Sequence, residues 1–525
     1  MDRPRWTFLL GLLSLLIGLS WVLQPKLAGD WSEYSLTAIA MARHGGPDIR
    51  LADVRAAQRA IPSGAAEFER VAKSIRSTDT VPALWFFRAR NKDVFASHFF
   101  AYSGLAAIPM TALGRAGKSP ARAFLIVNSL FVFVLGIALY RLFGSARRAA
   151  LALLMFMLSG GMAYWQWTST ECMSAAAFLA ALIFFATGAP IAAGVLAGIA
   201  TVQNPPLLLF AVFAPVLTMV MNDDPGLSFA DRAKRALKPR NLAGLAIVFA
   251  CAAIPVLFNI WAWGVPSIIA ATASNPALMS ASRLFSYYFD LNQGLIVGAP
   301  GICIVLAVLA TREAIRAPAE SGRMTLLLGT ALLCSISLAL PALSTVNWNS
   351  ASAGMMRYAF WGSVPLLLVL YDWLARMRAW PSALLLLALV VQAGASYAAS
   401  TYDFLHFGPL ARLAFDHRPQ IYSPELELFA ERTTHDETGL DAGRAYIYRA
   451  GNQPMKVLAH AGYSGLAADL CGPDRRVAAF ASRTPAGQGW EYLNGPFVCA
   501  QPATSQRSPP AQPGSPVMNK GSSGG

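Results

Sequence analysis

Charged side chains are scarce in this sequence. Only 13% of the 525 residues are Asp, Glu, Lys or Arg, whereas 55% are hydrophobic and the mean hydropathy is +0.45. A soluble protein of this length needs a far more charged surface. The hydrophobic residues also gather in runs of roughly 17–22 residues, about the length that crosses a bilayer as a helix. The composition therefore excludes an ordinary soluble protein and predicts an all-α polytopic membrane protein.

Motifs for nucleotides and structural metals are also absent. The sequence has no P-loop, no Gly-x-Gly-x-x-Gly after a strand and no Asp-x-Asp triad, so it gives no support for nucleotide-sugar use. Its six cysteines form no Cys-x-x-Cys pair and no His/Cys cluster, which argues against a zinc site. We therefore predict no cofactor and no metal ligands, and the sequence leaves a divalent cation open.

Basic residues outnumber acidic ones by 42 to 28, which gives a formal net charge of +14. In a soluble protein this charge would suggest a nucleic-acid partner. Here most Lys and Arg fall in short loops between apolar runs, as the positive-inside rule predicts, so no nucleic acid is expected. The first apolar run, Trp6–Leu23, follows Arg3 and Arg5. We interpret it as a retained first transmembrane helix, because no clear small-x-small cleavage signal follows it.

The apolar runs and loop charges predict about eleven spans, with the N-terminus in the cytoplasm and the C-terminus outside. The stretch Ile191–Met221 is predicted as two short helices that turn at Pro205 and Pro206, because this places the basic loop Asp223–Arg240 inside. The predicted spans are Trp6–Leu23, Phe124–Leu142, Ala149–Trp165, Cys172–Thr187, the two helices within Ile191–Met221, Leu242–Trp263, Leu295–Ala310, Met324–Leu343, Ala359–Trp373 and Ser382–Ala399.

This topology divides the chain into three regions. Residues 1–400 form a transmembrane domain, which includes a large first extracytoplasmic loop with interfacial helices at 24–120. Residues 401–500 are expected to form a small extracytoplasmic domain. Residues 501–525 are rich in Pro, Ser and Gly and are predicted to be disordered.

Polar residues at the outer ends of the apolar runs are the candidate functional residues, because charge at that depth must be paired, hydrated or functional. Asp30 and Glu33 are spaced i, i+3 and share one face of a helix that begins nearby. Asp30 is suited to take a proton from an acceptor hydroxyl. Its structural alternative is the N-cap of a helix that runs to His44.

Three further candidates lie at other outer ends, and each has a structural alternative. Arg357 stands just before a span, where it would bind a lipid phosphate or else snorkel to the headgroups. His98 would donate a hydrogen bond to phosphate or sugar, or else lie solvated at the interface. Glu171 would bind acceptor or sugar, or else mark a loop.

The remaining candidates fall late in the chain. Asp290 and Asn292 would contact the sugar, or else form a turn. Trp348 would stack on the sugar, or else belong to an aromatic belt at the interface. Cys471 and Cys499 are the only cysteines of the predicted outer C-terminal region, so we predict that they form a disulfide; two free thiols are the alternative.

Four segments, in this order, carry a resemblance to a known family. They are Gly29-Asp30-Trp31-Ser32-Glu33-Tyr34, Ser97-His98-Phe99-Phe100-Ala101-Tyr102, Tyr288-Phe289-Asp290-Leu291-Asn292-Gln293-Gly294-Leu295, and Trp348 through Gly354 with Arg357-Tyr358 and Pro365. Together they resemble bacterial GT-C glycosyltransferases, which include relatives of the protein O-mannosyltransferases and the lipid A aminoarabinose transferases. The family pattern has Glu directly after the Asp, whereas here Trp31 takes that place.

The resemblance implies a GT-C-like architecture and a bacterial inner-membrane glycosyltransferase. Its donor would be a polyprenyl-phosphate-linked sugar and its acceptor an extracytoplasmic glycan, lipid or protein. Asp30 would be the general base with Glu33 beside it, while Arg357 and His98 would bind the donor phosphate. Glu171 would bind sugar or acceptor.

Two other functions stay open. A lipid or sugar transporter or flippase would tend to place ionisable groups in mid-span and to show inverted repeats, whereas here the acidic groups lie at span ends and no repeat is clear. An oligosaccharide polymerase or ligase would carry its large loop late in the chain, whereas here the long loop follows the first span.

Overall fold

The computed structural model describes residues 3–77, 85–222, 228–315, 318–349, 352–437 and 439–501. The chain divides into two compact units. The first unit contains Met1–Arg412 and His435–Glu437, and the second contains Leu413–Thr434 and the chain from Thr438 onward. Apart from Gln501, the predicted disordered tail lies outside the described residues.

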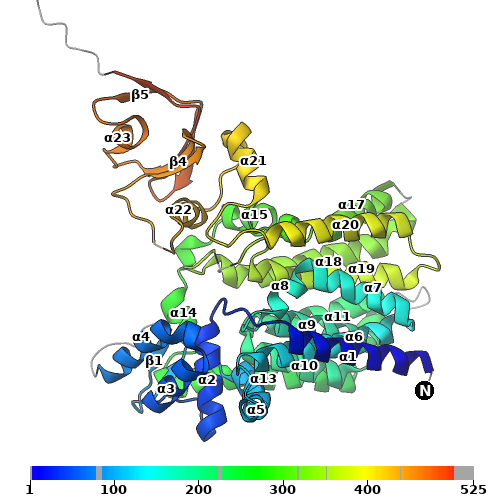
Figure 1. The fold of residues 1–525 in the computed structure, drawn as a ribbon. Helices are drawn as coiled ribbons and strands as arrows, with labels where there is room; N and C mark the ends of the chain where they lie inside the picture. The colour runs from blue at the N-terminus through cyan, green and yellow to red at the C-terminus, as the bar shows by residue number, and fades with distance from the viewer. Residues whose placement is uncertain are drawn as a thin grey trace, which may run out of the picture. The chain divides into compact units, whose positions relative to one another are not determined.

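Apolar helices build the first unit (Figure 1). In the described part, seven helical segments are long and apolar enough to cross a membrane. They are α1 (Arg3–Val22), α6 (Arg122–Phe143), the α7–α8 segment (Ala146–Trp165), α13 (Pro239–Trp263), α18 (Pro318–Leu343), α19 (Arg357–Arg376) and α20 (Ser382–Ala399). Three shorter apolar helices, α9 (Glu171–Ala186), α10 (Pro190–Gln203) and α11 (Phe210–Met221), pack among them. The fold is therefore that of a mostly helical polytopic membrane protein, and the number of eleven spans stays a prediction.

Prolines interrupt two of the apolar stretches. The predicted break within 191–221 is present, because α10 ends at Gln203 and Pro205 begins a 3-10 turn, η3 (Pro205–Leu209), before α11. The stretch 295–310 was predicted as one span but consists of the short α16 (Leu295–Gly298) followed by α17 (Pro300–Ile315). Proline lacks the N–H that would continue the helix, which accounts for both breaks.

The α7–α8 segment is interrupted without a proline. A π-helical turn, Met157–Gly161, joins α7 (Ala146–Phe156) to α8 (Met162–Trp165). Within it Gly160 has a φ of 102°, and a Cβ there would lie 2.8 Å from the Phe360 ring. Both the backbone angle and the close approach of α19 therefore require glycine at this position.

The predicted first loop, 24–120, folds into helices and a hairpin. Its elements are α2 (Trp31–His44), α3 (Leu51–Ala60), η1 (Pro62–Gly64), α4 (Ala65–Arg76), β1 (Phe86–Arg88), β2 (Val94–Ala96) and α5 (Ala101–Arg115). The predicted helix to His44 is α2, which ends at Gly45 with a φ of 78°. The buried Asp53 carboxylate accepts hydrogen bonds from Arg43 Nε and from the Arg50 backbone N–H, both at 3.0 Å. These bonds fix the start of α3 against the end of α2.

Shorter helices complete the chain between and after the spans. They are α12 (Phe229–Ala236), α14 (Ile268–Ala273), η4 (Pro276–Leu278), α15 (Ala281–Phe289), α21 (Pro409–His417), η5 (Pro419–Ile421), α22 (Leu426–Thr434) and α23 (Leu466–Cys471).

The second unit corrects the all-α prediction, because it contains an antiparallel four-stranded sheet in the order β3-β4-β7-β6. Its strands are β3 (Tyr446–Ala450), β4 (Gln453–His460), β6 (Ser482–Gly487) and β7 (Trp490–Asn494), and β5 (Arg476–Ala479) pairs separately with β8 (Val498–Ala500). Val457, Ala459, Leu470 and Leu493 form its apolar core. Strands this short carry a much weaker sequence signal than long apolar spans, which explains the wrong prediction.

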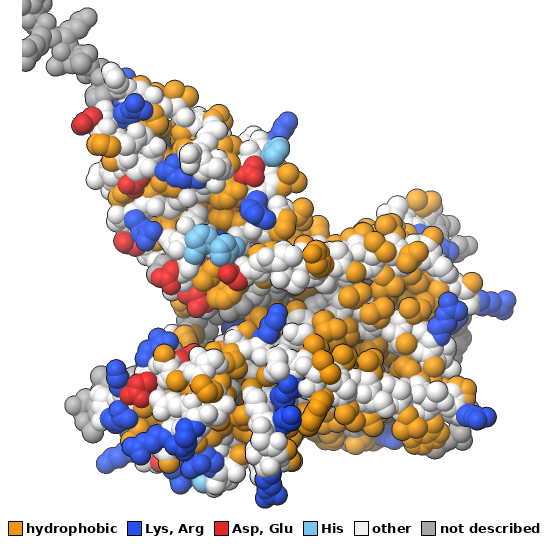
Figure 2. Space-filling view, viewed as in Figure 1, with side chains coloured by type: hydrophobic (Ala, Val, Ile, Leu, Met, Phe, Trp, Pro, Cys, Tyr) orange, Lys and Arg blue, Asp and Glu red, His pale blue; other side chains and the backbone are white. Residues whose placement is uncertain are grey.

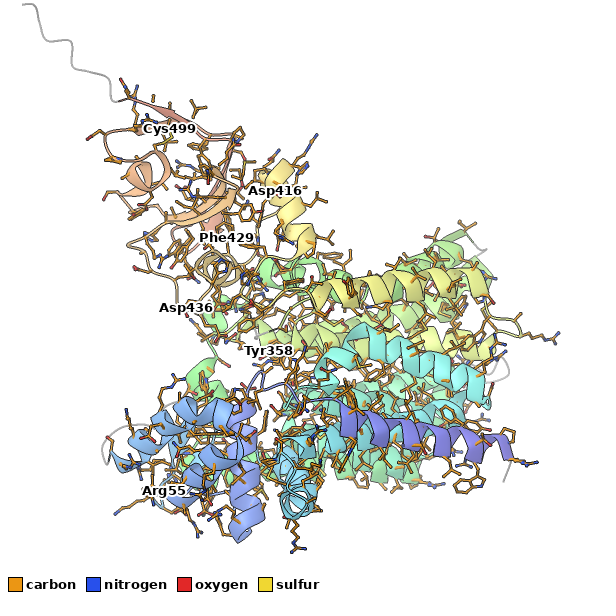
Figure 3. The ribbon with its side chains drawn as sticks, in the orientation of Figure 1. Arg55, Tyr358, Asp416, Phe429, Asp436 and Cys499 are labelled. Atoms are coloured by element: carbon orange, nitrogen blue, oxygen red, sulfur yellow. A yellow bond between two sulfur atoms is a disulfide. The ribbon has the colours of Figure 1, made fainter. Side chains whose placement is uncertain are left out.

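A disulfide joins α23 to β8 in the second unit. Cys471 and Cys499 have Cα atoms 5.6 Å apart, and Cys499 is labelled in Figure 3. The sequence predicts this pair from its place in an oxidising region, and the structure contains it. The other cysteines are free: Cys172, Cys251, Cys303 and Cys334.

Candidate functional site

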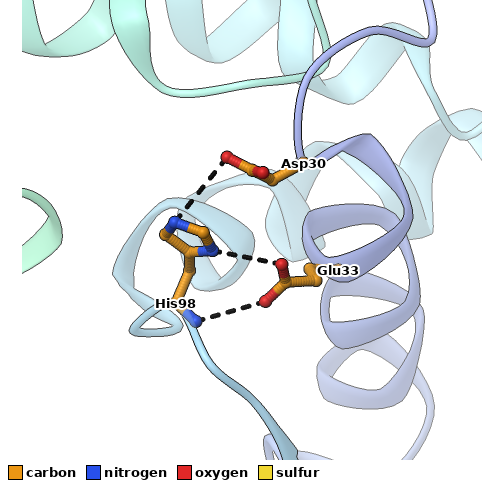
Figure 4. A group of neighbouring side chains, drawn as sticks. All are labelled: Asp30, Glu33 and His98. Atoms are coloured by element: carbon orange, nitrogen blue, oxygen red, sulfur yellow. Dashed lines mark hydrogen bonds and ion pairs between the residues drawn. The ribbon is translucent and has the colours of Figure 1, made fainter. Parts of the chain in front are cut away.

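Five of the sequence-predicted residues lie together in one largely buried network of the first unit, here called the outer network: Asp30, Glu33, His98, Glu171 and Arg357. Arg357 Nη1 donates to Asp30 Oδ2 at 2.6 Å and lies 3.7 Å from Glu171 Oε1. His98 lies between two carboxylates (Figure 4), with Nδ1 3.2 Å from Glu33 Oε1 and Nε2 3.6 Å from Asp30 Oδ2. The fold thus links residues as far apart as 327 positions.

Helix starts hold most of the outer network. Asp30 precedes α2, Glu33 lies in the first turn of α2, and Glu171 and Arg357 are the first residues of α9 and α19. Carboxylates are stabilised at helix N-termini by the helix dipole, whereas a guanidinium there is not. Arg357 therefore depends on Asp30 and Glu171 for its stabilisation, which ties the three helix starts to one another.

Each of these residues has contacts that its structural alternative does not describe. Asp30 occupies the N-cap position of α2, but its side chain makes no capping hydrogen bond. Arg357 is not a snorkelling anchor, because its side chain is only 13% exposed and pairs with carboxylates. His98 is bound to Glu33 rather than solvated, and Glu171 is buried against Arg357 rather than marking a loop.

Charges within the outer network set the protonation states. Burial opposes ionisation of Asp30, but the charges of Arg357 and His98 outweigh it, so the pKa of Asp30 lies below its ordinary value. At Glu33 burial dominates and raises the pKa of the carboxyl. Burial alone would lower the pKa of His98, yet the charges of Glu33 and Asp30 raise it to about 9. At neutral pH the network therefore contains an ionised Asp30 and an imidazolium.

Two neighbours complete the outer network; both stand in segments that carry the family resemblance, but neither was predicted as a site residue. Ser97 Oγ donates to Glu33 Oε2 at 2.9 Å, and the backbone N–H of His98 donates to the same oxygen at 3.2 Å. Tyr34 is buried, with its ring 5.5 Å from the His98 ring. Each stands next to a predicted residue in the sequence, and this adjacency was the signal that could have identified it.

A carboxylate from late in the chain also approaches the outer network. The segment His435–Glu437 belongs to the first unit, and the His435 ring stacks on the His406 ring at 4.3 Å. Burial and the neighbouring Asp436 raise the pKa of the Glu437 carboxyl, while the charge of Arg357 acts in the opposite direction. No local pattern in the sequence connects Glu437 with the first loop, so sequence reasoning missed it.

The other predicted sugar-binding residues have structural partners. Asp290 Oδ1 accepts the backbone N–H of Asn292 at 2.8 Å, as in a turn. Asn292 Oδ1 accepts the backbone N–H of Gly408 at 3.0 Å. Trp348 is fully buried with the Arg283 guanidinium 4.9 Å from its ring, so it has no ring face open to a sugar. The turn and packing alternatives therefore account for these three residues.

Asp30, Glu33 and His98 could also hold a divalent cation. One ligand atom of each lies within 4.8 Å of the others, and carboxylates and imidazoles are common metal ligands. The two His98 nitrogens face different carboxylates, however, and Arg357 already bonds Asp30 Oδ2. A cation would therefore have to displace the His98 proton or the Arg357 guanidinium.

A cavity of about 400 Å³ lies beside the segment that leads into α2. Its lining includes Lys26, Ala28, Tyr164, Trp167 and Tyr402, which together offer a cation, aromatic rings and apolar surface. This volume is in the range of small-molecule sites in proteins. None of the five residues of the outer network lines this cavity, but Ala28 precedes Asp30 by two residues, so the cavity offers space for a ligand near the outer network.

Comparisons with known proteins do not assign the chain to a family. No protein-family model, no curated protein and no solved structure matches the chain.

Proposed function

We propose that the protein is a membrane glycosyltransferase that transfers a sugar from a polyprenyl-phosphate donor to an extracytoplasmic acceptor. The observation that supports this most is the convergence of Asp30, His98, Glu171 and Arg357, which come from four separate segments. The arrangement offers a carboxylate, two cationic donors and an adjacent cavity. A general base for the acceptor and cationic groups for the departing phosphate are what sugar transfer from a lipid phosphate requires.

In the proposed reaction an acceptor hydroxyl attacks the anomeric carbon while Asp30 takes its proton. The bond between the anomeric carbon and the phosphate oxygen breaks, and polyprenyl phosphate leaves with the bonding electrons. Arg357 and His98 stabilise the negative charge that develops on that oxygen. Arg357 Nε lacks a hydrogen-bond partner among the described residues, so this donor is available without breaking the bond to Asp30.

Arg357 and Asp30 are coupled in this scheme. In the absence of donor the guanidinium lowers the pKa of Asp30, which weakens it as a base. A phosphate bound at Arg357 Nε adds negative charge close to Asp30, so the pKa of Asp30 rises and the carboxylate becomes a better proton acceptor. Donor binding would thus prepare the base for the transfer step.

The direct test is a transfer assay with purified protein in nanodiscs. Short-chain polyprenyl-phosphate hexoses and pentoses serve as donors and envelope glycans as acceptors, and release of polyprenyl phosphate is measured. Acceptor-dependent release supports the proposal.

A transporter is the second candidate, because the interrupted α7–α8 segment resembles the discontinuous helices of transporters. In proteoliposomes, movement of intact sugar lipid without release of polyprenyl phosphate would favour transport and overturn the proposed transfer.

A further inference from the structure

The first loop carries a basic surface that the outer network does not use. Six exposed basic side chains make no hydrogen bond and no ion pair with any described residue. They are Arg55 and Arg59 of α3, Arg70 and Lys73 of α4, and Arg90 and Lys92 near the β1–β2 turn. We call these six residues the α3–α4 basic surface. Figure 2 shows Lys and Arg side chains gathered over this region, and Arg55 is labelled in Figure 3.

Nearby acidic residues do not neutralise this surface. Asp48, Asp53 and Glu69 already pair with other basic residues, at 2.8, 3.0 and 3.4 Å. Glu67 and Asp93 make no ion pair with a described residue, and these two carboxylates are outnumbered by the six basic side chains. On α3 the two arginines are spaced i, i+4 and therefore lie on one face, about 6 Å apart along the axis. Arg70 and Lys73 of α4 are spaced i, i+3 and therefore also lie on one face of their helix. Ordered rows of unpaired cations attract an anionic partner.

The composition of the surface favours a polymer over a membrane. Helices that lie in a membrane interface bury an apolar face alongside their basic residues. Neither α3 nor α4 has an exposed large hydrophobic side chain: Val54, Phe68 and Val71 are fully buried, and Leu51 and Ile75 are partly buried. On α3 and α4 a lipid surface would therefore meet basic side chains but no large exposed apolar side chain, and the exposed Trp85 lies outside both helices, before β1. An extended soluble polyanion needs only the positive charge.

We propose that the α3–α4 basic surface binds a polyanionic polymer that carries repeated carboxylates or phosphates. This deepens the proposed function and rests on it, since such a polymer would be the acceptor or the carrier of the acceptor hydroxyl. Helix α3 packs against α2, which carries Glu33 of the outer network. A polymer held on α3 and α4 is thereby kept close to the transfer site.

Binding is tested without turnover, so the result does not depend on whether transfer occurs. The protein is placed in nanodiscs of neutral lipid and titrated with polygalacturonate, polyphosphate and neutral dextran, and separately with vesicles that contain phosphatidylglycerol. We expect both polyanions to bind, with affinity that falls as salt increases, and dextran not to bind. Binding to the vesicles alone would overturn the proposal in favour of a membrane surface.

Charge reversal locates the surface. Arg55→Glu/Arg59→Glu should weaken polyanion binding about tenfold or more, and Arg70→Glu/Lys73→Glu should do the same from the other helix. The matched control is Arg475→Glu/Arg476→Glu, which changes the total charge equally at exposed positions of the second unit. Thermal unfolding verifies that each variant is folded. If both α3–α4 variants bind as tightly as the control, the surface is not the binding site.

Discussion

The substitution Asp30→Asn tests the centre of the proposed mechanism. Asn has almost the same shape as Asp and removes only the ability to take a proton at working pH. Loss of a positioned general base typically reduces the rate by about 10²–10⁴-fold, which corresponds to roughly 3–5 kcal/mol in the barrier. Because Asp30 makes no capping hydrogen bond, the change leaves the start of α2 intact.

The charges of the outer network indicate that the variant will fold. The network contains three acidic side chains, Asp30, Glu33 and Glu171, and two basic ones, His98 and Arg357. The Asn variant keeps two acidic and two basic side chains. Arg357 keeps Glu171 at 3.7 Å, so its charge is not left unpaired. The cost in stability should therefore be smaller than the roughly 3–5 kcal/mol of an orphaned buried ion.

The assay compares initial rates of polyprenyl phosphate release, normalised to folded protein. Asp372→Asn is the matched control, because Asp372 is a buried carboxylate that pairs with Arg323 and Arg376 away from the outer network. We expect the control to lose stability while keeping its rate. Asp30→Asn should keep most of its stability and lose its rate. A near-normal rate in the Asp30 variant, or equal rate losses in both, would refute the role of Asp30 as base.

Four further predictions follow from the described contacts. Arg357→Ala should raise the donor KM and lower kcat, and Arg357→Lys should restore only part of both because Lys lacks the planar fork; donor titrations that match wild type would leave Arg357 a structural residue. The pKa of His98 is raised from 6.5 to about 9, so its contribution to stability is fully present below about pH 6.5 and is lost as pH rises through about 9; thermal unfolding against pH should show this loss in wild type and not in His98→Gln. Cys471→Ser/Cys499→Ser should reduce the unfolding free energy by about 3.5 kcal/mol, since the disulfide closes a loop with a sequence separation of 28, and an unchanged denaturation midpoint would contradict this. Reporter fusions at Lys234 and at the C-terminus should report opposite sides of the membrane, whereas the same side for both would disprove the predicted topology.

The residues of the outer network were predictable from sequence because a charge beside an apolar run is costly. Asp30, Glu33, His98, Glu171 and Arg357 all stand at such positions. Their pairing was not predictable, since it depends on how α2, α9 and α19 pack. The sequence assigned Arg357 to a phosphate, whereas the structure adds a direct bond to Asp30 that alters the chemistry of both.

The limits of prediction are clearest where signals are local and short. The break at Pro205 was identified because proline has a fixed backbone requirement. The sheet around Val457 and Leu493 was missed, because its strands are short and its two hairpins are joined by the pairing of β4 with the distant β7. The buried position of Trp348 was likewise invisible, since an interfacial and a buried tryptophan look alike in sequence.

The two compact units are interleaved along the chain, because His435–Glu437 belongs to the first unit while the residues on either side belong to the second. A truncation after Arg412 would therefore remove part of the first unit, including the Glu437 carboxylate and the ring that stacks on His406. For protein engineering, the C-terminal unit consequently cannot be exchanged by joining two sequences at a single position. A chimera that replaces it would have to preserve this three-residue insertion, with one junction on each side of it, to keep the membrane unit whole.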